Sequence, residues 1–232
     1  MLRIENLSVR YGSVRALTDV SLEVKEKGLL HGVIGPNGAG KSTLMDAITG
    51  RIKPSSGRVL LNGDDVTNRS VEWRRRKGMS RSFQRTSIFA GFTVGQQLEL
   101  VARKLNETHL HEIVSTFDLD GVYDEQADLI AYGDQRRVDI ALAMLGRPDL
   151  MLLDEPAAGL SSTETNALFG HLANLVRSRG VTAIVVEHDV DAVFRYCDVV
   201  TALDLGQLMI SGDPKTVRSN EQVVQAYLGS YA

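Results

Sequence analysis

The chain has 232 residues, a length typical of a single domain or of one domain with a subdomain. Hydrophobic residues make up 43% and charged residues 24%, a globular composition that excludes a disordered or collagen-like chain. The formal net charge of −3 excludes a broadly basic nucleic-acid-binding protein, so no nucleic-acid partner is expected.

The first third of the chain is predicted to form strands around one helix. Four segments have the period-two alternation or the apolar content of strands, namely residues 2–9, 16–24, 29–34 and 57–61. The third of these runs directly into a glycine-rich segment. Residues 41–49 predict a helix with its apolar side chains on one face, and Gly50 stands where such a helix ends.

Three groups of residues in the chain are predicted to carry no chemistry. The single Cys197 excludes an intramolecular disulfide and is predicted to be an inert core thiol. The basic cluster is interpreted as a solvated helix face, and it comprises Arg74, Arg75, Arg76, Lys77, Arg81 and Arg85. Four histidines lack carboxylates or cysteines at metal-ligand spacing and are predicted to be surface residues: His31, His109, His111 and His171.

From about residue 92 to residue 145 the apolar side chains repeat with the period of helices, and no strand pattern interrupts them. Strand patterns then return as short apolar runs at 149–153, 181–186, 198–203 and 207–210. Because a predicted helix at 162–178 joins the first two runs, these strands are expected to pair in parallel. Shorter helices are predicted at 189–196 and 220–228.

The pattern therefore predicts one α/β domain over residues 1–232. Residues 1–84 and 146–232 would form the core, and about 85–145 would form a helical insert.

A phosphate-binding loop is predicted at residues 35–42, whose sequence satisfies G-x-x-x-x-G-K-[ST]. Its glycines let successive main-chain N–H groups converge on an anion, and the following helix adds the positive end of its dipole. Lys41 would then reach the β- and γ-phosphates of ATP, and the Ser42 hydroxyl would ligate Mg²⁺. The candidate nucleotide-binding residues are Asn37, Gly38, Ala39, Gly40, Lys41, Ser42 and Thr43.

Two carboxylates end the apolar run at 150–153, at the edge of a parallel sheet where ligands bind. Asp154 is the candidate for the Mg²⁺ shell, and Glu155 is the candidate general base that accepts a proton from an attacking water.

With these motifs in this order, the chain resembles an ATP-binding-cassette (ABC) ATPase over nearly its whole length. The diagnostic segment is residues 130–137, Ile-Ala-Tyr-Gly-Asp-Gln-Arg-Arg, which resembles the signature of that family. Gln84 precedes it in a loop, and His188 follows the apolar run at 181–186. The resemblance implies a P-loop NTPase core of the ABC-ATPase type, with an antiparallel β subdomain and a helical subdomain that carries the signature.

The resemblance also implies roles for individual residues. Gln84 and His188 would act in catalysis beside Glu155, and Gln84 would also join the Mg²⁺ shell. Tyr11 stands where the family places an aromatic ring that stacks on adenine. The residues that would contact the nucleotide of the opposite subunit are Ala131, Gly133 and Gln135.

Two segments depart from the family pattern. Ala131 stands where the signature usually has serine, so one hydroxyl contact to phosphate is missing. The segment 159–162 resembles the loop that crosses the dimer interface, but Thr163 and Glu164 follow where aspartate is usual.

Within the family, three segments resemble the ATPases of branched-chain amino-acid importers: residues 81–84 with Ile88 and Phe89, residues 132–137, and residues 225–229. This implies ATP and Mg²⁺ as cofactors and a head-to-tail dimer with a second ABC ATPase, identical or not. It also implies membrane-spanning permease subunits, an indirect partnership with a periplasmic or extracellular solute-binding protein, and a peripheral place on the cytoplasmic face of the membrane.

Other functions stay open at this point. Importers of urea, short amides or polar amino acids resemble this subfamily equally well. A soluble ABC ATPase acting on DNA or ribosomes is disfavoured, because only about forty-seven residues separate Gln84 from Ala131 and the chain holds one cassette. A degenerate regulatory cassette is disfavoured because Lys41, Glu155 and His188 are all present.

Overall fold

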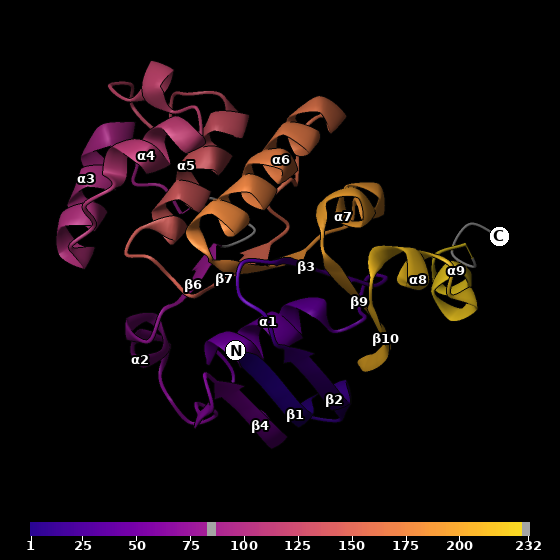
Figure 1. Ribbon diagram of the computed structural model, residues 1–232. Helices are drawn as coiled ribbons and strands as arrows, with labels where there is room; N and C mark the ends of the chain where they lie inside the picture. The colour runs from indigo at the N-terminus through magenta and orange to yellow at the C-terminus, as the bar shows by residue number, and fades with distance from the viewer. Residues whose placement is uncertain (83–86, 229–232) are drawn as a thin grey trace.

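The computed structural model describes residues 1–82 and 87–228. Two sheets and a layer of helices make up the molecule, with helix α1 (Lys41–Thr49) between the sheets (Figure 1). The smaller sheet has the order β2-β1-β4-β5, with strands β1 (Leu2–Tyr11), β2 (Val14–Val24), β4 (Ser56–Leu61) and β5 (Asp64–Asp65). All its pairings are antiparallel, as predicted for the β subdomain.

The larger sheet has six strands in the order β10-β9-β3-β8-β7-β6. They are β3 (Leu30–Ile34), β6 (Met79–Ser82), β7 (Leu150–Asp154), β8 (Thr182–Val186), β9 (Val199–Asp204) and β10 (Gln207–Gly212). Neighbouring strands pair in parallel from β6 to β9, which confirms the predicted pairing of β7 with β8, and β10 pairs antiparallel at the edge. The carboxyl ends of the central strands therefore meet at one edge.

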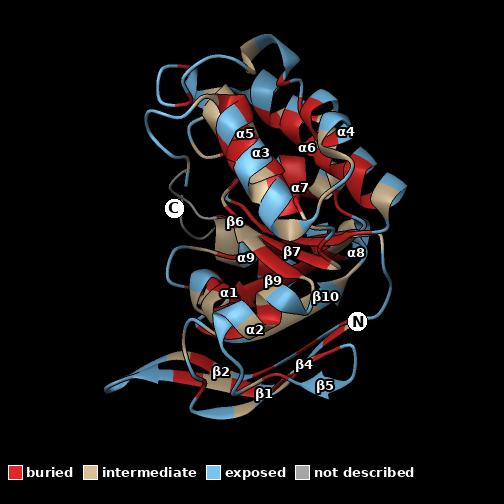
Figure 2. Cartoon of the chain, turned by 90° about the vertical axis from the view of Figure 1, so that its left-hand side faces the viewer, coloured by how far each residue is buried: buried red, intermediate tan, exposed pale blue. Residues whose placement is uncertain are grey.

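Side chains alternate between the two faces of this sheet along each strand, and both faces are covered and buried. In β7, Met151 and Leu153 join the core beneath the helices, whereas Leu150 and Leu152 join the core around α1 and the antiparallel sheet. Buried residues gather in the sheet and on the helix faces that cover it, and exposed residues lie on the outer sides (Figure 2).

The predicted helical insert contains α3 (Val94–Leu105), α4 (Leu110–Thr116), a short 3-10 helix (Asp120–Val122) and α5 (Tyr132–Met144). The remaining helices are α2 (Val71–Arg76), α6 (Ser162–Arg179), α7 (Val190–Tyr196), α8 (Pro214–Arg218) and α9 (Glu221–Leu228). No helix within residues 1–82 or 87–228 has the length and apolar content needed to span a membrane.

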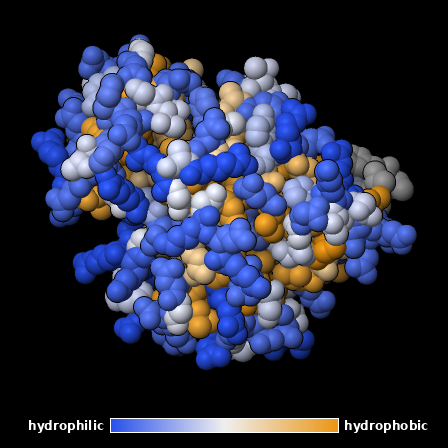
Figure 3. Space-filling model, viewed as in Figure 1, coloured by the Kyte–Doolittle hydropathy of each residue, from blue (hydrophilic) through white to orange (hydrophobic). Residues whose placement is uncertain are grey.

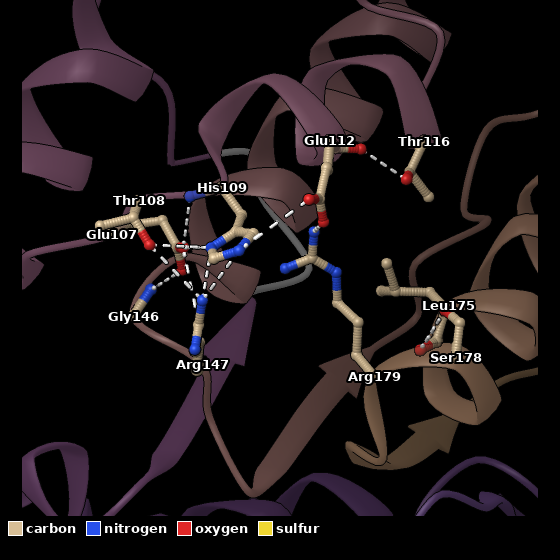
Figure 4. A network of polar contacts seen from close by, with 10 residues as sticks. All are labelled: Glu107, Thr108, His109, Glu112, Thr116, Gly146, Arg147, Leu175, Ser178 and Arg179. Carbon is tan, nitrogen blue, oxygen red and sulfur yellow. Dashed lines mark hydrogen bonds and ion pairs between the residues drawn. The ribbon is translucent and has the colours of Figure 1, made fainter.

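A polar network fastens this helical region, residues 92–145, to the core (Figure 4). The buried carboxylate of Glu107, just after α3, accepts hydrogen bonds from the main-chain N–H groups of His109 (2.8 Å) and Gly146 (3.2 Å). Arg147, beyond the end of α5, contacts both Glu107 and the His109 ring. The loop between α3 and α4 is therefore joined to the loop that leads into β7.

The interpretation of the basic cluster as a solvated helix face is wrong for Arg74, which is 1% exposed. Its guanidinium donates to the carbonyl oxygens of Ala47 (2.9 Å) and Ile48 in the last turn of α1, and to that of Thr67 (3.0 Å). Carbonyl groups at the end of a helix need such donors, and Arg74 supplies them from a distant segment.

The prediction that His31 is a surface residue is also wrong. His31 is 1% exposed in β3, and its Nε2 lies 2.8 Å from the Thr201 hydroxyl of β9. Burial lowers its pKa to about 4. Cys197 is a free, buried thiol as predicted, and burial raises its pKa.

Candidate functional site

The loop between β3 and α1 has the conformation that its glycines were expected to permit. Gly38 and Gly40 have φ angles of 83° and 98°, in the left-handed region that favours glycine. A Cβ atom on Gly40 would lie 2.7 Å from the carbonyl oxygen of Ala16 in β2, so a larger residue would also collide with the antiparallel sheet. The loop therefore depends on glycine for both its turn and its packing.

Lys41 begins α1 and points its ammonium group back into this loop. It is 6% exposed, and its Nζ donates to the carbonyl oxygens of Gly35 (2.6 Å) and Pro36 (3.1 Å). Burial lowers the pKa of Lys41, while the charges of Glu155 and Asp154 act in the opposite direction. The structure thus brings the lysine and the two predicted carboxylates to one place, the carboxyl edge of the larger sheet.

Arg81, in β6, joins two strands of this edge to α1. Its guanidinium contacts Asp154 Oδ2 at 2.8 Å and Asp46 Oδ1 at 2.5 Å, and all three side chains are largely buried. The interpretation of Arg81 as part of a solvated helix face is therefore wrong, because Arg81 lies in a strand and its side chain is 8% exposed. The contacts show that Arg81 holds one oxygen of the Asp154 carboxylate and balances its charge.

Glu155 follows β7 in an uncommon backbone conformation. Its φ angle is 48°, which costs a non-glycine residue about 1 kcal/mol. Its N–H donates to the carbonyl oxygen of Val186 (2.9 Å), and its Oε1 lies 2.9 Å from Nε2 of His188. The two residues predicted for catalysis, from loops that follow neighbouring strands, therefore form a pair.

Two buried residues that sequence reasoning missed hold the segment around Glu155. Arg136 in α5 is 0% exposed and donates to the carbonyl oxygens of Asp154 (3.1 Å), Glu155 (2.5 Å) and Pro156 (2.9 Å). Its position within the signature segment gave no indication of these contacts, because the next residue is also an arginine and is only partly buried.

Glu187 is the second missed residue. Its carboxylate is buried and accepts from the main-chain N–H groups of Ala157 (2.6 Å) and His188 (3.1 Å). Burial raises the pKa of Glu187, and the charge of Glu155 adds to this, although the two N–H groups oppose it. The only sequence signal was a charged residue at the end of a buried strand.

The three signature residues predicted to contact nucleotide, Ala131, Gly133 and Gln135, lie at the start of α5. Ala131 is the N-cap residue of α5 and supplies no side-chain hydrogen bond to it. Gln135 donates to the carbonyl oxygen of Ile130 (3.0 Å), so its amide braces the signature turn of its own chain. Leu129 and Tyr132 are 74% and 45% exposed, large fractions for apolar side chains that flank a predicted contact.

The segment that resembles the interface loop packs against the signature. Ser161 caps α6, and the Glu164 side chain returns to the Ser161 N–H at 2.8 Å, which completes a capping box. A Cβ atom on Gly133 would lie 3.1 Å from Glu164 Oε1. Glu164 therefore stabilises this loop through the capping box, and its carboxylate lies next to Gly133 of the signature.

The remaining predicted residues are placed as follows. Tyr11 ends β1 and is 51% exposed, on the sheet whose strand β2 contacts the phosphate-binding loop. Asn37, Gly38 and Ser42 are exposed on that loop. Gln84, together with Phe83, lies outside the described residues.

The donor set at this edge fits magnesium better than a transition metal. The Ser42 hydroxyl and the Asp154 carboxylate are oxygen donors, which Mg²⁺ prefers together with phosphate oxygens. No group of three or more histidine, cysteine, aspartate or glutamate residues at metal-binding distance occurs among residues 1–82 and 87–228.

An apolar groove with a volume of about 620 Å³ lies between the helical region and the core. Figure 3 shows it as an indentation at the left of the molecule, and α3 and α5 lie above it while α2 and β6 lie below. Phe89, Leu100 and Leu142 line it, and Arg51, whose side chain is 48% exposed, is among the arginines that also line it. Two apolar residues lie close to Phe89: Ile88 packs against the core, and Phe92 is 42% exposed beside the Phe89 ring.

Known proteins resemble this chain over its full length. The sequence model of the family described as ABC transporter matches residues 17–158. The high-affinity branched-chain amino acid transport ATP-binding protein BraF of Pseudomonas aeruginosa is 34% identical over 99% of this chain and 98% of its own length. The protein with the same description named LivG in Escherichia coli K12 is 32% identical over the same shares. The crystal structure of MJ1267 in its ADP conformation, described as an ATP-binding cassette of an ABC transporter, covers 99% of this chain and 98% of its own, with a TM-score of 0.87 and 30% identity.

Proposed function

The chain belongs to the ABC transporter family, and from that premise we propose that it is the ATP-hydrolysing subunit of an importer for branched-chain or related hydrophobic amino acids. The full-length similarity to BraF and LivG supports the solute class, because both proteins are described as branched-chain amino acid transport ATP-binding proteins. The observation that carries the enzymatic part is the pairing of Glu155 with His188 beside the phosphate-binding loop.

Nucleotide binding is assigned to the loop and the start of α1. On binding, the Lys41 ammonium would exchange its carbonyl acceptors for phosphate oxygens, whose negative charge also restores its ordinary pKa. Tyr11 would stack on the adenine ring. Ser42, Asp154 and Gln84 would hold Mg²⁺, which neutralises charge on the phosphates.

Glu155 is assigned the general base. Its carboxylate would take the proton of an attacking water, and His188, 2.9 Å away, would keep the carboxylate in place by a hydrogen bond. The role of Gln84 in this step follows the family resemblance.

The exposed signature residues support a head-to-tail arrangement of two ATPases. Ala131, Gly133 and Gln135 would approach the nucleotide held by the other subunit, with the N-terminus of α5 directed at its phosphates. Because Ala131 has no hydroxyl, that approach would depend on main-chain N–H groups. The second ATPase can be another copy or a related chain.

The apolar groove is assigned to the permease subunits, through which the ATPase would sit on the cytoplasmic face of the membrane. A short amphipathic helix of a permease would place its apolar face on Phe89 and Leu100, with an acidic group towards the exposed Arg51. A periplasmic or extracellular solute-binding protein would then deliver the solute to the permease.

Purification of the native complex tests the proposal. We expect this chain to co-purify with two membrane subunits and an ATPase partner, and the cognate binding protein to take up leucine, isoleucine or valine from a solute panel. Binding of urea, short amides or polar amino acids alone would change the solute class and leave the transport role in place. A chain that purifies with nucleic acid or ribosomes and without membrane subunits would contradict the proposal.

A further inference from the structure

The segment from Asp154 to Ala157 carries Glu155 and is held from two sides by buried side chains of opposite charge. From the side of α5, Arg136 donates to three successive carbonyl oxygens, those of residues 154 to 156. From the side of β8, Glu187 accepts the N–H of Ala157 at 2.6 Å. A cation on carbonyls and an anion on an N–H both match the local main-chain dipoles, so the two contacts stabilise one conformation.

That conformation needs external support. With φ at 48°, Glu155 has a backbone that its own side chain disfavours, and a relaxation to negative φ would redirect its carboxylate. The Glu155 side chain is 16% exposed, and its main-chain N–H is held by the carbonyl oxygen of Val186 at 2.9 Å. The main-chain contacts of Arg136 and Glu187 hold the segment on either side of that hydrogen bond and so help to keep the carboxylate aimed at His188.

Glu187 also acts on the other member of the pair. Its second oxygen accepts the main-chain N–H of His188 at 3.1 Å, while its first oxygen holds Ala157. One carboxylate thus joins the two loops from which Glu155 and His188 project, and it sets the distance between them.

We infer that Arg136 and Glu187 are positioning residues that hold the Glu155–His188 pair in the geometry required for hydrolysis. The inference rests on the proposed function, in which Glu155 is the base. Arg136 lies about one turn from the start of α5, the helix that begins with the signature segment. The segment that carries Glu155 is consequently connected through Arg136 to α5, the helix that would contact the nucleotide of the other subunit.

The chain offers matched controls for both residues. Glu107 is a buried carboxylate that also accepts two main-chain N–H groups, but in the network of Figure 4. Arg147 lies outside the assigned sites and contacts Glu107 and the His109 ring rather than the segment after β7. The variants to compare are Glu187→Gln with Glu107→Gln, and Arg136→Lys with Arg147→Lys.

The experiment measures kcat and KM for ATP in the full-length chain, binding of a fluorescent ATP analogue, and thermal unfolding. We expect Glu187→Gln and Arg136→Lys to lower kcat on the order of tenfold or more, because a small misplacement of a catalytic group has effects of that size. KM and analogue binding should stay within about twofold, as for loss of an interaction made only in the transition state. Both control variants should keep wild-type kcat.

The double variant sharpens the result. Because both residues hold one segment, their effects on log kcat should fall short of additive, whereas Glu187→Gln combined with Glu107→Gln should be additive. The inference would be overturned if Glu187→Gln had the kcat of the wild type, or if its loss of kcat were explained entirely by unfolded protein. Hydrolysis of ATP by the wild-type chain would still uphold the proposed function in that case. A wild-type chain that binds ATP without hydrolysing it would overturn both.

Discussion

Two regions of the molecule differ in how their side chains are paired. One is the nucleotide edge, formed by residues 35–43 with Asp154, Glu155 and His188, and the other is the signature end of α5, residues 128–135. At the nucleotide edge the charged side chains are paired within the chain, as Asp154 is with Arg81 and Glu155 with His188. At the signature end, Leu129 and Tyr132 are largely exposed and the first turn of α5 has no side-chain cap. In the proposed function the first region would hold nucleotide, whereas the second would meet the surface of another subunit.

Glu155→Gln should produce the largest effect, because it removes the base and leaves the rest of the nucleotide edge intact. General-base contributions are about 10²–10⁴-fold, so steady-state ATP hydrolysis should fall by that factor. Binding of a fluorescent ATP analogue should stay near the wild-type value. Near-normal hydrolysis by purified Glu155→Gln would remove Glu155 from its assigned role.

Lys41→Ala should break the nucleotide edge at the binding step instead. A hydrogen bond to a charged group is worth about 1.5–3 kcal/mol, so ATP affinity should fall roughly 10–150-fold. Titration with the same analogue measures this, and Lys53→Ala, at a lysine outside the predicted site, serves as the control. Unchanged affinity in Lys41→Ala would show that phosphate is held elsewhere.

Phe89→Ala probes the groove between the helical region and the core. Its ring is 49% exposed, so truncation should leave ATP binding by the isolated chain unchanged. A lost apolar anchor weakens an interface by about 1–3 kcal/mol, so assembly with permease subunits or solute uptake should drop about tenfold. Normal assembly together with normal uptake would place the docking surface elsewhere. Ile88→Asp is a poorer choice, because Ile88 packs against the core.

Two buried carboxylates outside these regions, Glu187 next to the nucleotide edge and Glu107 after α3, should have opposite effects on how stability depends on pH. Burial raises the pKa of Glu187 above its ordinary value of 4.5, so its destabilisation of the fold grows as pH rises from about 4.5 through the raised value. Burial also acts to raise the pKa of Glu107, but hydrogen bonds from His109 and Gly146 and the charge of Arg147 outweigh it and lower the pKa. The stability that Glu107 contributes is present above pH 4.5 and is lost as pH falls through the lowered value.

Unfolding free energies measured from pH 3 to 7 test this contrast, because the range includes the pH below 4.5 at which Glu107 titrates and the pH above 4.5 at which Glu187 titrates. Relative to the wild type, Glu187→Gln should gain stability as pH rises, and Glu107→Gln should lose stability as pH rises. The same slope in both variants would show that the two environments do not differ as described.

Much of the fold followed from the sequence because its signals are local. The apolar runs predicted β7 and β8 and their parallel pairing, and the glycines with Lys41 predicted the turn into α1. Strand β6 was missed because Met79–Ser82 is short and polar, and Arg81 within it is buried beside partners that are distant in sequence, Asp46 and Asp154 among them.

The site residues that belong to a sequence motif were predicted. Those that act through contacts with a segment distant in sequence were missed. Lys41, Asp154, Glu155 and His188 come together as expected. Arg136 and Glu187 bind main-chain atoms of a segment distant in sequence, and no periodicity or spacing encodes such a contact. Arg74 was misread for the same reason, since the α1 carbonyls that it satisfies lie about 26 residues away.

The most direct test of whether the signature end completes a nucleotide edge in another subunit is the ATPase activity per molecule, measured from nanomolar to micromolar protein. The mass of the Glu155→Gln variant in the presence of ATP is measured alongside it. Hydrolysis should be weak in the dilute monomer and should rise faster than linearly with concentration as pairs form. ATP should shift Glu155→Gln towards the mass of two chains, because its nucleotide is not consumed. A dilute monomer with full, concentration-independent activity would contradict this and would place a complete site within one chain.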